Sequence, residues 1–159
     1  YLTKFVDDGW MRQHGFAHAD WEMGTIAEMV RSRPPQTVIT VPDDRSLGDA
    51  VELFKRHGIS QMPCTSDGVL TGIITETDLL SQLVQGRKQD SSIAEVMVRR
   101  VSTVSAHDSA ATLQEIFERG EVAIVVDDER HVLAVLTKMD LIDFLANRTR
   151  LQESRQQAR

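Results

Sequence analysis

The chain has 159 residues, of which 41% are hydrophobic and 26% charged, and its formal net charge is −6. This composition is typical of a folded domain, and the acidic balance argues against a nucleic-acid binder, which needs a basic face. No apolar run reaches the ~20 residues that a membrane helix requires. The single cysteine, Cys64, can form neither an internal disulfide nor, by itself, a zinc site. With no secretory segment in view, we expect a cytoplasmic protein.

An internal duplication organises the sequence. Thr-Ile-Ala-Glu-Met-Val at 25–30 returns as Ser-Ile-Ala-Glu-Val-Met at 92–97. The segment 72–80, which contains Thr-Glu-Thr-Asp, is echoed at 134–142 by Thr-Lys-Met-Asp. Two copies at a period of roughly sixty residues do not make a solenoid, which needs three or more repeats. The pattern predicts two similar units packed face to face.

The first copy predicts a short helix capped at Thr25, followed by strand, helix, strand, strand and helix. β-branched residues favour the first strand, at 37–41. An apolar face at helical spacing predicts the next helix, with Gly58 as its stop; that face comprises Leu47, Ala50, Val51 and Phe54. Asp67-Gly68 is a hairpin signal between strands at 59–65 and 69–75. The last helix starts near Asp78, and we expect it to bury Leu79, Leu80 and Leu83.

The second copy predicts the same order. Its capping residue is Ser92, and its strands are expected at 101–104, 122–127 and 132–137. Between the first two strands lies a helix with Leu113, Ile116 and Phe117 on one face and Gly120 as its stop. A last helix begins near Asp140 and is expected to bury Leu141, Ile142 and Leu145. Residues 148–159 are polar, which indicates a frayed helix end or a disordered tail.

Three motifs carry a resemblance to a known family. They are His-Gly-Ile-Ser-Gln-Met-Pro at 57–63, Gly-Ile-Ile-Thr-Glu-Thr-Asp at 72–78 and Ala-Val-Leu-Thr-Lys-Met-Asp at 134–140. In this duplicated order they resemble the cystathionine β-synthase (CBS) domain, and two such units in tandem resemble a Bateman module. The resemblance implies an α/β (α+β) fold of two β-α-β-β-α units related by a pseudo-twofold axis.

The resemblance also sets the expected domains. The segments 1–5 and 8–16 resemble the joint that follows the catalytic core in cystathionine β-synthases. They imply the C-terminal regulatory module of a bacterial-type enzyme, and the start at Tyr1 rather than Met leads us to expect a fragment. We therefore expect four parts: a linker at 1–23, a first unit at 24–86, a second unit at 87–147 and a polar tail at 148–159.

Each copy carries Thr-x-x-Asp at a strand-to-helix junction. One interpretation is helix capping, because Thr is a favoured N-cap residue and an acid suits the first helical turn. The resemblance implies a second role, in which the Asp accepts hydrogen bonds from ribose hydroxyls and the Thr touches the ribose or phosphate. A carboxylate has two oxygens and can hold a vicinal diol through both. Capping and binding can coexist at one Asp.

The resemblance further implies two adenosine clefts, each pairing the acid of one unit with a strand of the other. The favoured cleft comprises Thr137, Lys138 and Asp140 with the wall Ile59, Ser60, Gln61 and Met62. The second cleft comprises Thr75 and Asp78 with the wall Val122 and Ala123. We favour the first because Lys138 stands beside its acid. Glu76 stands beside the other acid, where it would repel a polyphosphate, and Glu121 precedes the second wall.

The resemblance implies a regulatory module that binds an adenosine-containing small molecule, with S-adenosylmethionine as first choice and AMP, ADP or ATP as second. The alternative is a structural dimerisation module with no physiological ligand. In that case the side chains of Ile59, Met62 and Val122 fill the clefts. We expect no catalytic residue here, with pyridoxal phosphate confined to a catalytic core outside this chain. We also expect a homodimer that contacts this core, without membrane or nucleic acid as a partner. We expect no metal, because His14 and His18 lack a third ligand.

Overall fold

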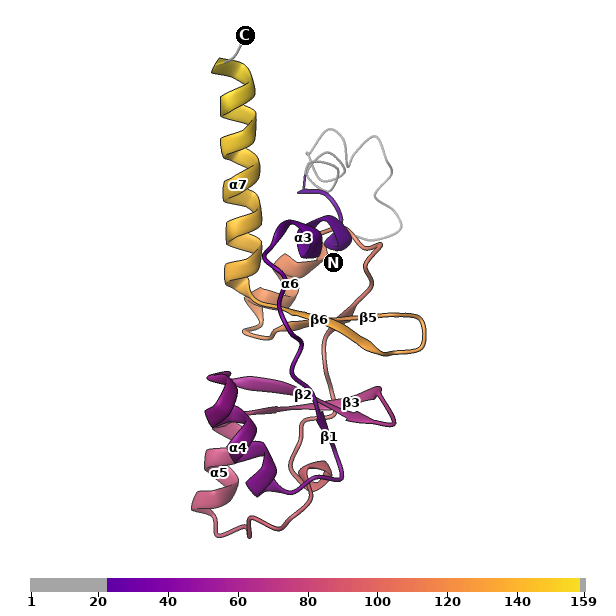
Figure 1. Ribbon diagram of the computed structural model, residues 1–159, viewed down its shortest axis with the longest axis vertical. Coiled ribbons are helices and arrows are strands. Elements are labelled where there is room, and N and C mark those ends of the chain that lie inside the picture. The colour runs from indigo at the N-terminus through magenta and orange to yellow at the C-terminus, as the bar shows by residue number, and fades with distance from the viewer. Residues whose placement is uncertain (1–22, 158–159) are drawn as a thin grey trace, which may run out of the picture. The chain divides into compact units, whose positions relative to one another are not determined.

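The computed structural model describes residues 23–157, with side chains described through Arg148 (Figure 1). Almost all of the predicted linker, including His14 and His18, lies outside these residues. The described part forms a mixed α/β fold with two three-stranded sheets and five α-helices. None of the helices in 23–157 combines the length and the apolar character that crossing a membrane requires.

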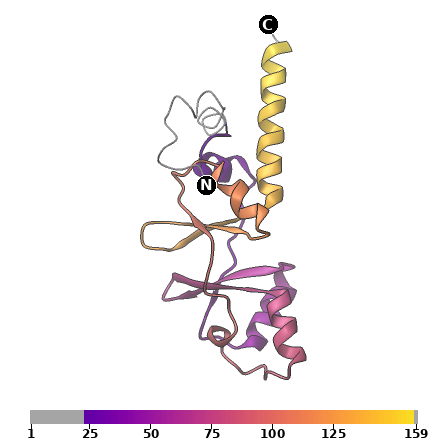
Figure 2. The ribbon, with the colours of Figure 1, turned by 180° about the vertical axis from the view of Figure 1, so that it is seen from behind.

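The first copy has the predicted order of elements. Helix α3 (Ile26–Ser32) precedes β1 (Val41–Pro42), α4 (Leu47–His57), β2 (Gln61–Ser66), β3 (Val69–Thr75) and α5 (Glu76–Val84). Strand β1 runs parallel to β2, and β2 runs antiparallel to β3. The hairpin signal is confirmed, since Asp67 and Gly68 both have positive φ, 51° and 81°. Helices α4 and α5 lie side by side against this sheet, as the view from behind also shows (Figure 2).

The second copy repeats this order. A 3₁₀ turn, η1 (Ile93–Glu95), precedes β4 (Thr103–Val104), α6 (Thr112–Glu118), β5 (Ala123–Val126), β6 (Val132–Leu136) and α7 (Lys138–Gln157). Its sheet has the strand order β4-β5-β6. Helix α7 continues to Gln157, so the segment expected as a frayed end or a tail is helical to that residue.

The described chain packs as two compact units that draw on separated segments. We call the unit within 1–35, 104–123 and 136–159 the terminal unit, and the unit within 36–103 and 124–135 the central unit. The acid of the second copy, Asp140, therefore lies in the terminal unit. Asp78, the acid of the first copy, lies in the central unit.

The core of the central unit forms where α4 covers its sheet. Ser46 caps the helix by accepting from the Asp49 N–H, and Gly58 ends it in the left-handed conformation, as predicted. Between these two caps the apolar face of α4 meets strand residues and the η1 segment. The buried members are Val41, Leu47, Ala50, Phe54, Met62, Cys64, Ile74, Leu79, Ile93 and Met97.

In the terminal unit, backbone hydrogen bonds connect α3 to the segment that precedes α6. Thr25 caps α3 as predicted, by accepting from the Glu28 N–H. The backbone N–H of Ile26 donates to the Asp108 carbonyl at 2.9 Å, and the N–H of Ala110 donates to the Gly24 carbonyl at 2.9 Å. Helix α3 also lies beside the start of α7 (Figure 1). This neighbourhood brings the end of α3 to the acid of the second copy.

Two of the predicted strands are shorter than expected. The run 37–41 contributes only Val41 and Pro42 to a ladder, opposite Cys64 and Thr65. The run 101–104 contributes only Thr103 and Val104. β-branched residues favour an extended backbone, but a ladder forms only where a partner strand runs alongside.

The predicted burial of Leu80 and Ile142 is wrong. Leu80 is 64% exposed and Ile142 is 53% exposed, whereas their neighbours Leu79 and Leu141 are buried. Consecutive helical residues point about 100° apart, so Leu79 and Leu141 face the core while the next residue turns outward. The two exposed positions correspond in the repeat.

Candidate functional site

Asp140 occupies the first turn of α7, directly after β6. Its Oδ2 accepts from the backbone N–H of Thr137 at 2.8 Å and from the Thr137 hydroxyl at 3.2 Å. The Asp140 N–H reaches back to the same hydroxyl at 3.4 Å. This reciprocal arrangement is the predicted cap of the helix, and it fixes the position of the carboxylate.

Arg33 is a contact of this carboxylate that the sequence analysis missed. Its Nη1 lies 3.4 Å from Asp140 Oδ2, and the two side chains are 13% and 20% exposed. Arg33 is the C-cap residue of α3 and stands 107 positions from Asp140 in the sequence. No local pattern could reveal this pair, because it depends on α3 packing beside α7.

The two oxygens of the Asp140 carboxylate have different surroundings. Oδ2 receives all three donors, two from Thr137 and one from Arg33. Within the part of the chain that the structure describes, Oδ1 receives no hydrogen bond. A carboxylate oxygen has about two lone-pair sites, so Oδ2 is fully used while Oδ1 is open to a donor.

The other predicted residues of the terminal unit are Lys138, Val122 and Ala123. Lys138 is exposed at the first position of α7, beside the Asp140 turn. Ala123 is fully buried at the start of β5, and Val122 is half-buried. Glu121, whose charge we expected to weigh against this wall, forms an exposed ion pair with Arg119 at 3.4 Å.

Asp78 forms the matching cap in the central unit. Thr75 N–H donates to Asp78 Oδ2 at 3.3 Å, and Asp78 N–H donates to the Thr75 hydroxyl at 3.1 Å. Among the described residues Asp78 has no basic partner, in contrast to Asp140 with Arg33. Glu76, beside it, is exposed. The two acids therefore share the same capping geometry and differ in their charged neighbours.

The predicted wall 59–62 also lies in the central unit. The carbonyl of Ser60 accepts from the Glu76 N–H at 2.9 Å, and Gln61 stands opposite Thr75 in the β2–β3 ladder. The structure thus brings the wall next to the first turn of α5. Its pairing with Asp140 stays a prediction.

Met62 belongs to the core, whereas Ile59 is only half-buried. Met62 is completely buried in the core of the central unit, and Ile59 packs against that core. Ser60 is exposed and Gln61 half-buried. Of the four wall residues, Ile59, Ser60 and Gln61 therefore keep surface that a ligand could contact, and Met62 does not.

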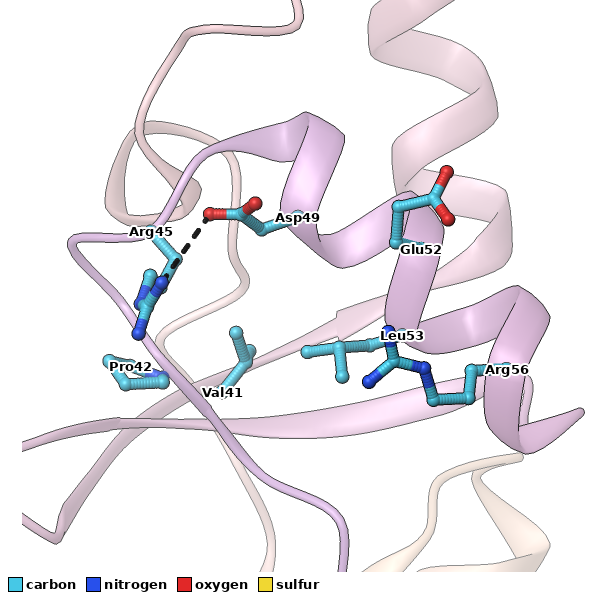
Figure 3. Close-up of a pocket in the computed structure, with 7 residues that line it drawn as sticks. All are labelled: Val41, Pro42, Arg45, Asp49, Glu52, Leu53 and Arg56. Carbon is cyan, nitrogen blue, oxygen red and sulfur yellow. Dashed lines mark ion pairs between the residues drawn. The ribbon is translucent and has the colours of Figure 1, made fainter.

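A separate cavity of about 320 Å³ lies beside α4 in the central unit (Figure 3). Val41 and Leu53 lie between Arg45 and Arg56, and Arg45 pairs with Asp49 at 3.9 Å. Both partners of this pair are more than half exposed, so the pair contributes little to stability. The cavity is lined by Val41, Pro42, Arg45, Asp49, Glu52, Leu53 and Arg56, and includes no residue of either predicted cleft.

Neither a metal centre nor a reactive thiol is formed by the described residues. No group of three or more His, Cys, Asp or Glu side chains among them is placed to hold a metal ion. Burial, with a smaller contribution from the charge of Asp43, raises the pKa of the Cys64 thiol to about 12. Cys64 is therefore a neutral core residue at physiological pH.

The fold and the duplicated acid turns define a tandem CBS-domain module. The family model for the CBS domain matches the chain twice, at residues 26–85 and 93–147. The chain therefore belongs to the CBS domain family. Modules of this family are regulatory rather than catalytic.

The curated relatives include the rabbit (Oryctolagus cuniculus) cystathionine β-synthase, 26% identical over 96% of this chain and 31% of that protein. A homoserine O-acetyltransferase of Methanocorpusculum labreanum is 32% identical over 74% of this chain and 23% of that protein. The module is thus homologous to the CBS-domain region of cystathionine β-synthase. It spans about a third of the length of the cystathionine β-synthases it matches.

Solved structures of CBS-domain pairs share the fold. The pair from protein MJ0100, in complex with 5′-methylthioadenosine and S-adenosyl-L-methionine, has a TM-score of 0.66 and 24% identity, covering 79% of this chain and 98% of that one. The CBS domain of a bacterial CNNM/CorC family Mg²⁺ transporter, in complex with ATP, has a TM-score of 0.66 and 21% identity, covering 85% and 97%. The ligands in both complexes contain adenosine.

Proposed function

We propose that the chain is a regulatory module that binds an adenosine-containing effector and controls the activity or assembly of a cystathionine β-synthase-like enzyme. The observation that carries this proposal is the fixed, partly exposed carboxylate of Asp140 in a tandem CBS module. Its Oδ1 is open to a donor, as binding of a ribose hydroxyl requires.

The favoured cleft combines Asp140, Thr137 and Lys138 with the wall formed by 59–62. The second cleft combines Thr75 and Asp78 with Val122 and Ala123. Lys138 and Arg33 support the choice of the first, because they give the Asp140 turn two cations, whereas Glu76 stands at the Asp78 turn. In this proposal the pyridoxal phosphate chemistry belongs to a catalytic core outside the chain.

The effector is S-adenosylmethionine or an adenine nucleotide. The similarity to cystathionine β-synthases, which extends over the expected linker, supports S-adenosylmethionine, as does the ligand of the MJ0100 pair. The complex of the transporter domain supports ATP. In this proposal all of these compounds bind Asp140 through the same ribose diol. The diol therefore defines the class of effector, and the group at the 5′ position distinguishes the members of that class.

The module is also proposed to form a homodimer in the cytoplasm. Exposed apolar residues on α5 and α7 support this partner, because such side chains lose contact with water when a second copy covers them. They are Leu80, Val84, Met139 and Ile142. The catalytic core of the parent enzyme is the second proposed partner.

Calorimetric titration of the 159-residue chain with AMP, ATP and S-adenosylmethionine tests the proposal. We expect saturable heat with at least one compound. We expect none with a ribose-free control, free adenine together with inorganic phosphate, at equal ionic strength. If no adenosine compound binds while the chain is folded and dimeric, the structural dimerisation module is the better description.

A further inference from the structure

The cavity beside α4 lies wholly within the central unit and has two sides (Figure 3). One side is a face of α4, whose four lining residues recur at three- and four-residue spacing: Asp49, Glu52, Leu53 and Arg56. Val41 and Pro42 of β1 line the other side, and Arg45 lies just before the helix. The volume of about 320 Å³ is at the lower end of the range for small-molecule sites, so the cavity suits a small metabolite.

The lining carries two guanidinium groups and two carboxylates, and only one of each is paired. Arg45 lies 3.9 Å from Asp49, and this is the ion pair drawn in Figure 3. Within the part of the chain that the structure describes, the side chains of Glu52 and Arg56 form no hydrogen bond or ion pair, with each other or with another residue. The cavity therefore presents one unpaired carboxylate and one unpaired guanidinium, one helical turn apart.

The balance of these charges selects the chemistry of the ligand. The lining has no net charge, so it gives a polyanion no net attraction, and its two carboxylates repel a phosphate group. A zwitterion satisfies both unpaired groups at once, because its carboxylate accepts from the guanidinium and its ammonium donates to the carboxylate. An α-amino acid joins these two charges through a single carbon. Its charges are therefore close neighbours, as Glu52 and Arg56 are on successive turns of α4.

The rest of the lining is apolar and suits an aliphatic side chain. Val41 is buried, and Leu53 packs against the core of the central unit while keeping part of its surface. A ligand side chain laid on Leu53 and Pro42 loses contact with water, which is favourable when that side chain is aliphatic. A charged side chain in the same place would lose water without gaining a partner.

We propose that the cavity beside α4 is a binding site for a free α-amino acid with an aliphatic side chain. Its carboxylate binds Arg56, its ammonium binds Glu52, and its side chain lies on Leu53 and Pro42. The cavity shares no residue with either adenosine cleft, so this site is independent of the proposed function and adds a second class of ligand to the module.

The test is a calorimetric titration of the 159-residue chain with L-leucine and with two analogues that each lack one charge. Isocaproate is leucine without the ammonium group, and isoamylamine is leucine without the carboxylate. L-Leucine gives saturable heat, and each analogue binds more weakly by on the order of tenfold or more, because one charged contact is lost. Arg56→Met weakens the binding of L-leucine by on the order of tenfold. Lys55→Met is the matched control, since Lys55 is the adjacent exposed cation of α4 outside the lining, and it leaves the binding unchanged.

Glu52→Gln is the second variant, and it weakens L-leucine and isoamylamine but not isocaproate, which has no ammonium group. Both substituted side chains are exposed, so neither change disturbs the core. The proposal is overturned if L-leucine gives no saturable heat, if either analogue binds as tightly as L-leucine, or if Arg56→Met binds L-leucine as tightly as the parent does. It is also overturned if inorganic phosphate binds the parent and is lost in Arg56→Met, because the cavity is then an anion site. None of these results changes the expectation for adenosine compounds at Asp140.

Discussion

The Asp140 carboxylate forms a helix cap, and we propose that it also binds the ligand. At Asp140 the sequence alone left helix capping and ligand binding as alternatives, and the structure has the cap, formed through Oδ2. The open Oδ1 leaves room for the second role. An acid in the first turn also interacts favourably with the helix dipole, by about 0.3–1 kcal/mol. Replacing it should therefore affect ligand binding far more than folding.

Cys64 gives a prediction about pH. Its pKa is raised from 9.0 to about 12 by burial in the core. The unfolded chain therefore releases the thiol proton at lower pH than the folded chain does. The stabilising contribution of the neutral, buried thiol is complete below pH 9 and is lost as the pH rises from 9.0 towards 12. Urea unfolding of the parent and of Cys64→Ala, measured between pH 8 and about 10.5, should show a steeper loss of stability in the parent.

The same burial predicts low reactivity. In the folded protein Cys64 should react with a soluble disulfide reagent at pH 8 only as fast as the chain opens, and rapidly once urea unfolds it. A fast reaction without denaturant would show that the thiol is accessible, contrary to the structure.

Individual residues differ in how well the sequence predicted them. The caps Thr25 and Thr75 and the turn Asp67-Gly68 follow from local chemistry, and all are confirmed. The Arg33–Asp140 pair could not be predicted, because it joins residues 107 positions apart through tertiary packing. The complete burial of Met62 could not be predicted either, since a short apolar run does not show which side chain faces the core.

At the scale of elements, one glycine holds a strand against the next segment. Gly72 lies in β3, and a Cβ placed there would meet the Val98 carbonyl oxygen and the Met97 sulfur, each at 2.8 Å. The backbone of Ile73 exchanges two hydrogen bonds with Val98, both 2.8 Å, so the Val98 carbonyl cannot easily retreat. This close approach requires a residue without a side chain.

Gly72→Ala should therefore destabilise the protein by about 1–3 kcal/mol, the usual cost of overpacking. Gly48→Ala is the matched control: its Cβ would lie at ordinary contact distances of 3.5 Å or more, and alanine is the better helix former. Thermal unfolding should show a lower midpoint for Gly72→Ala and an unchanged or higher one for Gly48→Ala. Equal midpoints for the two variants would contradict the close approach at Gly72.

The order of elements was predictable and their extents were not. Hydrophobic spacing and caps predicted β-α-β-β-α in both copies, and the order is confirmed. The strands at 37–41 and 101–104 were predicted too long. β-branched residues favour an extended backbone, but they do not indicate where a neighbouring strand runs alongside. In the last helix of each copy, spacing alone did not separate the inward Leu79 from the outward Leu80.

At the scale of the whole molecule, the exposed apolar positions predict self-association. Val84 is 77% exposed and Leu80 64% on α5, and Ile142 occupies the position of Leu80 in the second copy. Light scattering after size exclusion should give twice the chain mass of 17.9 kDa. The double variant Leu80→Asp, Ile142→Asp should shift this mass towards that of one chain, because a buried charge opposes association.

Leu133→Asp is the control for this prediction, since Leu133 is an exposed apolar residue of β6 rather than of α5 or α7. It should leave the mass unchanged. If light scattering gives the parent the mass of a single chain at high concentration, the homodimer prediction is wrong. That result would not affect the proposal for the adenosine site.

The central claim is that the module binds adenosine ligands through Asp140, and one calorimetric comparison tests it most directly. The parent, Asp140→Ala, Asp140→Asn and Asp78→Ala are titrated with AMP under identical conditions. Hydrogen bonds to a charged group are worth roughly 1.5–3 kcal/mol, so Asp140→Ala should bind on the order of ten- to a hundredfold more weakly than the parent. Asp140→Asn, which keeps the shape and loses the charge, should also bind weakly, and Asp78→Ala should lose less. Parent-like binding by a folded Asp140→Ala would contradict the claim, and a selective loss in Asp78→Ala would assign the ligand to the other cleft.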